Sequence, residues 1–339
     1  MREVGKRGGG GITIRDVAGK AGVSVASVSR AFNSLDNVRE ETKARIMAAA
    51  SELGYVPHAG ARSLSIARTQ AIGVVLPDLH GEFFSECVRG MDRAANRRGY
   101  LVLLSNMHDG RAQLDGVLRA LRGRVDGMLI MAPHVPVDVL DQALSRGVPV
   151  VLINSGAIDG RLPSIEVESA AAIDGLVRHF AENGRQAVVH IAGPRDNREA
   201  LDREENYIRS LRRYLPEARL RVYPGDFTEA GGEAAAMQIL ASTEACDAIF
   251  AANDSMAIGC LTALRRAGHS VPDEIAVAGY DNIPLARHLG LTTVHVPIAD
   301  IGGRAMNRLI DALEGEPQTL KPDHVQAELV IRATTGGAG

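Results

Sequence analysis

From about residue 70 onward, short runs of apolar residues alternate with longer stretches in which apolar residues recur at helical spacing. This alternation predicts parallel strands joined by crossover helices. The apolar runs span residues 71–77, 100–105, 127–132, 148–154, 187–193, 248–253 and 274–281. Residues 163–168 separate two sets of these runs, and a further segment at 292–297 returns toward the first set. We therefore expect an α/β body of two lobes with parallel sheets.

Residues 12–57 have a different pattern, which predicts three short helices. Thr13 and Asp16 have the spacing of a capping box at the first helix, Gly22 suits a sharp turn, and Ser24 suits the N-cap of the second helix. A third helix is expected over residues 40–53, ending at Gly54. The expected core residues are Val17, Ala18, Ala21, Val28, Phe32, Ile46, Ala49, Ala50 and Leu53. Two helices joined by a glycine turn are typical of a helix-turn-helix head that enters the DNA major groove.

Charge is divided between the two parts of the chain. Residues 1–68 contain 11 Lys and Arg against 6 Asp and Glu, whereas the rest contains 27 against 35. A basic head attracts phosphates and an acidic body does not, so the charge distribution agrees with DNA binding by the head. The segment 1–11 has no apolar run, which predicts a disordered arm and no signal peptide or membrane anchor.

Cysteine, histidine and glycine patterns argue against several other classes of protein. Cys87, Cys246 and Cys260 have no metal-ligand or redox spacing, which favours a cytoplasmic protein without a disulfide framework. The histidines show no metal-ligand spacing. No P-loop, G-x-S-x-G elbow or H-E-x-x-H motif is present, so the sequence predicts no metal, no cofactor, no catalytic residue and no enzyme.

Three motifs occur in a fixed order at the beginning of the chain. Residues 13–18 read TIRDVA, residues 22–30 read GVSVASVSR, and residues 55–64 read YVPHAGARSL. With these motifs the chain resembles the lac repressor family, and its body is similar to the type I periplasmic-binding-protein fold that this family uses as a sensor. The resemblance implies a homodimeric transcription regulator, a repressor, whose affinity for pseudo-palindromic double-stranded operator DNA is controlled by a small molecule.

The resemblance also implies which residues contact DNA. The second helix would be the recognition helix, and residues 58–65 would form a hinge helix that folds only on specific DNA, since the segment is too short to be a stable helix by itself. The implied contacts are Val25, Ala26, Ser29 and Arg30 with bases, Ser27 and Asn33 with phosphates, and Ala61 and Leu64 with the minor groove. Arg30 can donate two hydrogen bonds to guanine, and Val25 and Ala26 offer apolar surface to thymine methyls.

An effector site is expected at the carboxyl ends of the strands in the body. The residues that match the family's effector positions are Phe83, Phe84, Asn197, Arg203, Phe227, Asn253, Asp281 and Ile298. The Arg203 guanidinium suits vicinal hydroxyls or a carboxylate equally, and Asp281 can accept two hydroxyl hydrogen bonds. Asp254 is interpreted as a helix N-cap. Packing of Phe83 and Phe84 and an Asx turn at Asp281 remain alternative interpretations.

These patterns predict the following division of the chain: an arm at 1–11, the head at 12–57, a hinge and linker at 58–68, and the effector and dimerisation domain at 69–335. The first lobe would contain about 69–165 and 296–322, and the second about 166–295 and 323–335. The Arg203, Asn253 and Asp281 side chains around Phe227 predict a carbohydrate effector. Two alternatives stay open at this point: a sugar-binding transport protein with no DNA role, and a regulator that uses a non-sugar corepressor.

Overall fold

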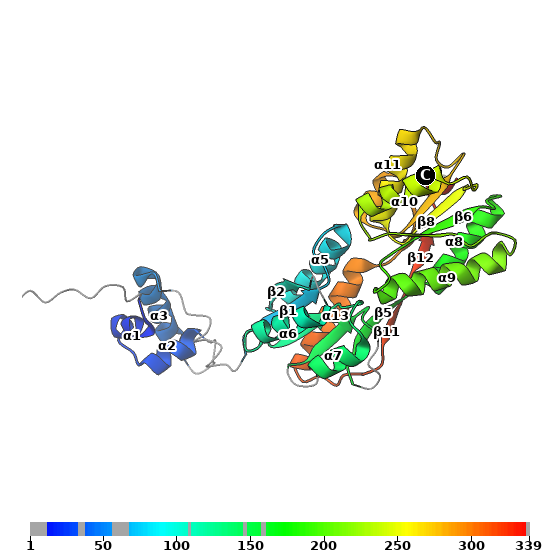
Figure 1. The fold of residues 1–339 in the computed structure, drawn as a ribbon. Helices are drawn as coiled ribbons and strands as arrows, with labels where there is room; N and C mark the ends of the chain where they lie inside the picture. Colours follow the sequence, from blue (N-terminus) through cyan, green and yellow to red (C-terminus); the bar gives the residue numbers. More distant parts are fainter. Residues whose placement is uncertain are drawn as a thin grey trace, which may run out of the picture. The chain divides into compact units, whose positions relative to one another are not determined.

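The structure is a computed structural model that describes residues 12–32, 38–55, 68–107, 110–144, 148–156 and 161–336. The chain divides into two compact units, Met1–Gln70 and Ala71–Gly339, drawn as ribbons in Figure 1. Each unit has hydrophobic core residues of its own. Asn33, Ala61 and Leu64, together with the arm at 1–11 and the hinge at 58–65, lie outside the described residues.

The first unit contains the three predicted helices, α1 (Ile14–Ala21), α2 (Val25–Phe32) and α3 (Glu40–Leu53). Val17, Val28 and Ile46, one from each helix, are fully buried against one another. The Phe32 ring lies 5.8 Å from that of Tyr55, at the edge of the same core. The predicted three-helix bundle is therefore confirmed.

The ends of α1 and α2 are set by local hydrogen bonds. The Asp16 carboxylate accepts a hydrogen bond from the Thr13 backbone N–H at 2.7 Å, as a capping box requires. Gly22 has a φ of +63°, which glycine adopts at little cost, and it turns the chain toward α2. The Ser27 N–H then donates to the Ser24 hydroxyl at 3.1 Å, so Ser24 caps α2 as predicted.

The second unit contains two six-stranded sheets. Their strand orders are β11-β5-β4-β3-β1-β2 and β12-β10-β9-β8-β6-β7. The first sheet consists of β1 (Ala71–Leu76), β2 (Leu101–Asn106), β3 (Gly127–Ile130), β4 (Val150–Ile153), β5 (Ser164–Glu168) and β11 (Asp323–Gln326). The second consists of β6 (Val188–Ala192), β7 (Val222–Pro224), β8 (Ala248–Ala251), β9 (Ala276–Asp281), β10 (Thr292–His295) and β12 (Glu328–Val330).

All strand pairs are parallel except that of β10 with β12. Every residue of β1 is buried, as expected for an inner strand whose two faces are both covered by helices. In contrast, β2 lies at the sheet edge, and its Leu101 is 70% exposed. The predicted two-lobed architecture with parallel sheets is thus confirmed.

Helices cover the sheets of both lobes (Figure 1). The helices of the first lobe are α5 (Glu82–Arg97), α6 (Gly110–Leu121), α7 (Val137–Leu144) and α13 (Ile298–Leu313). Those of the second lobe are α8 (Ala170–Glu182), α9 (Arg198–Tyr214), α10 (Glu229–Ala241), α11 (Asp254–Ala267) and α12 (Pro284–His288), followed near the end of the chain by the 3-10 turn η1 (Ala333–Thr335).

The chain crosses between the lobes three times, and two crossings come later than the sequence predicts. Asp323 pairs with Ile165 as the first residue of β11, so residues 323–326 belong to the first lobe, not to the second. Likewise, β5 extends the first lobe to Glu168 instead of 165. The boundaries were misplaced because β11 is a short polar strand whose partner is remote in sequence. The remaining crossing, between β10 and α13, falls at residues 296–297.

The helices α5 and α13 lie side by side in the first lobe (Figure 1) and approach unusually closely. A Cβ atom added at Gly90 would overlap the carbonyl oxygen of Ala299, and one added at Gly302 would overlap that of Cys87. The same arrangement joins α10 and α11 through Gly232 and Gly259. Glycine is therefore required at these positions by close backbone approach.

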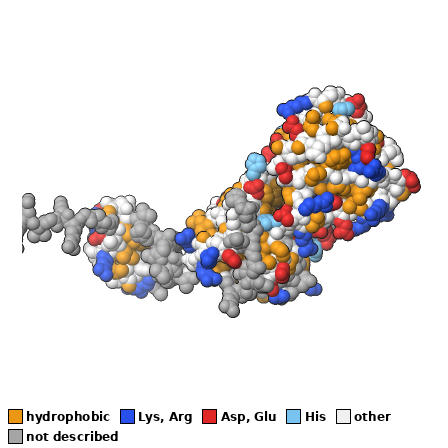
Figure 2. All heavy atoms as spheres, viewed as in Figure 1, with side chains coloured by type: hydrophobic (Ala, Val, Ile, Leu, Met, Phe, Trp, Pro, Cys, Tyr) orange, Lys and Arg blue, Asp and Glu red, His pale blue; other side chains and the backbone are white. Residues whose placement is uncertain are grey.

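On the face of the second unit that Figure 2 shows, basic and acidic side chains are interspersed with apolar ones. Among the described residues, no helix combines the length and the apolar character needed to span a bilayer.

The close approach of α5 and α13 gives a test. Gly90→Ala should lower the free energy of unfolding by about 1–3 kcal/mol, because the new methyl group must displace a helix backbone. Gly116→Ala is the matched control, since Gly116 is also helical and no atom lies within 4 Å of its added Cβ. The control should gain about 0.5–1 kcal/mol. Urea unfolding of both variants decides the matter, and equal stabilities would contradict the packing described.

Candidate functional site

The first candidate site is the outer face of α2. Val25 is 41% exposed, and Ala26 and Arg30 are also exposed. Ser27 and Ser29 are half-buried at the sides of this face, whereas Val28 and Ala31 face the core. The Arg30 Nε donates to the Ala26 carbonyl at 3.2 Å, which lays the side chain along the exposed face. The predicted base-facing residues therefore share one accessible surface.

The second candidate site is a cleft of about 640 Å³ in the second unit. It is built at the carboxyl ends of the strands in both sheets, where parallel α/β proteins bind ligands. The residues that line it are Pro77, Asp78, His80, Gly81, Glu82, Phe83, Phe84, Met131, Pro133, Asn154, Asn197, Glu199, Arg203, Asp226, Phe227, Thr228, Glu229, Ala230, Asn253, Ser255, Ile258, Asp281, Ile283 and Leu285.

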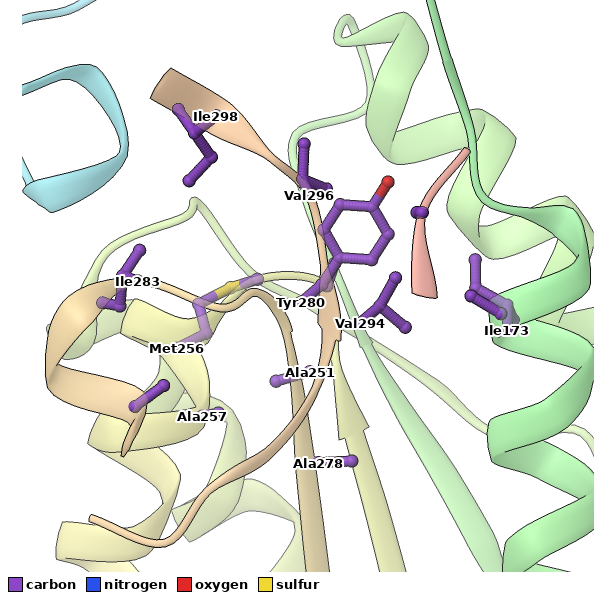
Figure 3. Packing of buried hydrophobic residues seen from close by; sticks show 14 of the residues in the cluster. Ile173, Ala251, Met256, Ala257, Ala278, Tyr280, Ile283, Val294, Val296 and Ile298 are labelled. Carbon is purple, nitrogen blue, oxygen red and sulfur yellow. The ribbon is translucent and has the colours of Figure 1, made fainter. Parts of the chain in front are cut away.

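Seven of the eight predicted effector residues line this cleft, and Ile298 does not. Ile298 is 5% exposed and belongs to the hydrophobic core, together with Val296 and Tyr280 (Figure 3). The first residue of a helix that follows a crossing segment can point either way, and here packing directs it inward. Phe83 and Phe84 combine both expected roles, because they line the cleft and pack edge to face against each other and the core.

Arg203, from α9, is held in place by the end of β8, by β9 and by a residue of its own helix. It is 7% exposed, and its Nη1 donates to the Ala252 carbonyl at 2.7 Å. The guanidinium carbon lies 3.7 Å from the ring centroid of Tyr280, a cation–π contact. Its Nη2 is 3.8 Å from the Glu199 carboxylate, one helical turn earlier. The arginine is therefore fixed before any ligand arrives.

Two carboxyl groups flank this arginine, those of half-buried Glu199 and buried Asp281. Burial raises the pKa of Glu199 to about 7, although Arg203 opposes the shift. Burial also raises the pKa of Asp281 well above its ordinary range, again against the attraction of Arg203. Within the described residues, Oδ1 of Asp281 has no hydrogen-bond partner. A ligand that donates an O–H or N–H to this oxygen would satisfy it.

The residue that caps α11 differs from the one predicted. Asn253, not Asp254, is the N-cap, because its Oδ1 accepts from the Met256 N–H at 2.9 Å. Asp254 is fully buried and joins three elements, accepting from the Ile283 N–H at 2.9 Å and the Thr293 hydroxyl at 2.6 Å. The interpretation of Asp254 as an N-cap is therefore wrong.

Asn253 also holds Phe227 in position at the wall of the cleft. Its Nδ2 donates to the Phe227 carbonyl at 3.0 Å. Phe227 itself has a φ of +66°, an unusual conformation for a large residue. Its ring lies against Gly193, where a Cβ atom would overlap it. Asn197 has a similar double position, since it lines the cleft and its Oδ1 caps α9 through the Ala200 N–H.

Several cleft residues were not predicted from the sequence. Glu199 precedes Arg203 by four residues on one helix face, and this spacing could have revealed the pair. Glu82 and Leu285 lie 203 residues apart, yet the Leu285 N–H donates to the Glu82 carboxylate at 2.9 Å across the two lobes. The Arg198 N–H likewise donates to the Pro133 carbonyl at 3.0 Å. No sequence signal marks these two interlobe contacts.

The fold and the two sites define a class: a helix-turn-helix head joined to a periplasmic-binding-protein-like domain. Residues 13–58 match the model of the bacterial regulatory proteins of the lacI family, and residues 177–335 match that of the periplasmic binding protein-like domain. The chain is 33% identical to the HTH-type transcriptional repressor CytR of Escherichia coli (strain K12) over 331 residues, which cover 95% of this chain and 96% of that protein. The chain therefore belongs to the lacI family.

Solved structures agree with this assignment. The lac repressor dimer bound to operator and the anti-inducer ONPF superposes with a TM-score of 0.82 at 26% identity, covering 96% of this chain and 99% of that chain. A complex of the transcriptional regulator CelR with cellobiose superposes with a TM-score of 0.70 at 29% identity, covering 95% and 99%.

The unpartnered Asp281 oxygen predicts that Asp281→Asn raises the unfolding temperature of the ligand-free protein at pH 8. A raised carboxyl pKa means that the folded state binds more protons than the unfolded chain, so the ionised form costs stability at high pH. The advantage of the variant should shrink as the pH falls and the wild-type carboxyl takes up its proton. Thermal unfolding from pH 8 to pH 5 checks this, and an advantage independent of pH would contradict the assigned burial cost.

Proposed function

We propose that the protein is a homodimeric, sequence-specific transcription repressor and that a small sugar-like molecule in the cleft controls its affinity for operator DNA. The observation that carries the proposal is the presence, in one chain, of an exposed α2 face on a helix-turn-helix unit and of a preformed polar cleft. A transport protein would have no use for the head. The relatives named above are repressors and regulators, which supports a protein without catalytic function.

DNA recognition is assigned to the accessible face of α2. Arg30 reads guanine, Val25 and Ala26 contact thymine methyls, and Ser29 offers one hydroxyl. Phosphate contacts by Ser27 and Asn33, and minor-groove contacts by Ala61 and Leu64, remain predictions from the sequence, as do the domain boundaries at the hinge and a cytoplasmic location.

Effector recognition is assigned to Arg203, Asn253 and Asp281, with Phe227 as an apolar floor. Asn197, Phe83 and Phe84 complete the walls. Contacts such as that of Leu285 with Glu82 span the cleft. A ligand that binds among these contacts changes the angle between the lobes. A change in lobe angle would move the two hinges of a dimer apart or bring them together. This movement would alter operator affinity, with a coupling free energy of typically about 1–3 kcal/mol. A sugar-like site favours an inducer over a corepressor.

The experiment that tests this function begins with selection of duplexes by the full-length protein from a random pool. Binding to the selected site should weaken steeply with salt, because Lys and Arg neutralise phosphates. Sugars, sugar acids and other small metabolites are then screened for thermal stabilisation and for release of the selected duplex, and the hit is repeated with Arg203→Ala and Asp281→Ala. Failure to select any duplex would contradict the DNA role. A hit that survives both substitutions would contradict the cleft assignment, and a non-sugar hit would favour the corepressor alternative.

Arg30→Ala gives a sharper test of the DNA interface. The variant should lose about 1–3 kcal/mol at the selected site and change little on random duplexes, because paired hydrogen bonds to a base carry sequence information. Arg30→Lys is the matched control, which keeps the charge and lacks the planar fork. Fluorescence anisotropy with both duplexes measures the difference. Equal losses on both duplexes would assign Arg30 to phosphate binding instead.

A further inference from the structure

Acidic groups dominate the titratable side chains of the cleft. Six carboxyl groups line it, those of Asp78, Glu82, Glu199, Asp226, Glu229 and Asp281. Arg203 is the single Lys or Arg among the described lining residues. An entering anion would therefore meet one cation and a surplus of like charge.

Three of the carboxyl groups that do not flank Arg203 already accept hydrogen bonds from backbone N–H groups. Asp78 accepts from the Leu79 N–H at 2.6 Å, and Asp226 accepts from the Thr228 N–H at 2.9 Å. Glu82 accepts from Leu285 across the cleft. Each of these three carboxyl groups therefore already has a backbone N–H as a hydrogen-bond donor.

The positive charge of Arg203 is also committed. Its Nη1 is bonded to the Ala252 carbonyl, its face covers the Tyr280 ring, and its Nη2 faces Glu199. Asp281 adds a second carboxyl group that acts on the same guanidinium. Two carboxyl groups, those of Glu199 and Asp281, thus act on the single guanidinium of Arg203. A phosphate or carboxylate that approached Arg203 would therefore meet a guanidinium on which two carboxyl groups already act.

Asp281 and Arg203 nevertheless each have a buried polar atom without a hydrogen-bond partner among the described residues. The Oδ1 atom of Asp281, a residue 5% exposed, has no partner in the described part of the chain. The Nε of Arg203 is likewise buried without a partner there. The free acceptor oxygen of Asp281, close to a guanidinium that faces Glu199, suits a ligand with several O–H or N–H donors.

We propose that the cleft selects uncharged or cationic ligands rich in hydrogen-bond donors and rejects phosphates and carboxylates, and that Glu199 is the residue that sets this selectivity. The proposal rests on the assignment of the cleft as the effector site. It narrows the chemistry that Arg203 alone leaves open, because a guanidinium without Glu199 and Asp281 would bind hydroxyls and anions equally well. Burial raises the pKa of Glu199 to about 7, so a cationic group would also displace a proton there.

Inorganic phosphate is the probe that tests the proposal without knowledge of the effector. The unfolding temperature of the full-length protein is measured against phosphate concentration, with chloride holding the ionic strength constant. Removing acids from around Arg203 should create an anion site, and a ligand that binds only the folded state raises its stability. We expect the phosphate-dependent rise to be smallest for the wild type, larger for Glu199→Gln, and largest for Glu199→Gln with Asp281→Asn.

The basic head can also bind phosphate, so each of the three proteins is compared with a counterpart that carries Arg203→Gln. The excess over that counterpart measures the cleft alone, and the wild type should show none. If the double variant does not fold, Glu199→Gln alone still decides the question. A wild-type excess as large as that of Glu199→Gln would overturn the proposal, as would an anionic hit in the effector screen. Neither result bears on DNA binding, so failure here is distinguishable from failure of the proposed function.

Discussion

Two lobes joined by three crossing segments can change their relative orientation only when all three segments bend together. The cleft of the second unit depends on this constraint. The crossings leave each lobe near the carboxyl ends of its strands, where the cleft lies. Contacts such as Leu285 to Glu82 and Arg198 to Pro133 span the cleft on either side. A ligand held between the lobes would therefore act mainly on the angle between the two sheets.

The surroundings of Arg203 show how a binding site can be preorganised at some cost to the stability of the folded protein. Arg203 is fixed from α9, from the end of β8 and from β9, so little side-chain entropy is lost when a ligand binds. The same crowding buries Asp281 with an unsatisfied oxygen. Buried polar groups without partners are uncommon in proteins, and they concentrate at sites that bind something.

Features decided by neighbours in sequence were predicted well. The capping box of Thr13 and Asp16, the turn at Gly22 and the cap at Ser24 all follow from local chemistry, and the apolar inner strands follow from burial on both faces. What failed depends on contacts between remote residues. The strands β7 and β11 are short and partly exposed, so only their pairing identifies them. The inward direction of Ile298 and the buried bridging position of Asp254 depend in the same way on packing against other elements.

The glycine contact between α5 and α13 has a consequence for how such a protein can acquire new ligands. Helices whose backbones touch have no intervening layer of side chains, so α5 and α13 are packed as one rigid pair at Gly90 and Gly302. The start of α5 carries Phe83 and Phe84 into the cleft wall, whereas the start of α13 follows directly from a crossing segment. Aromatic residues at the start of α5 can thus be exchanged during evolution to suit another ligand while the close packing of α5 on α13 is inherited unchanged.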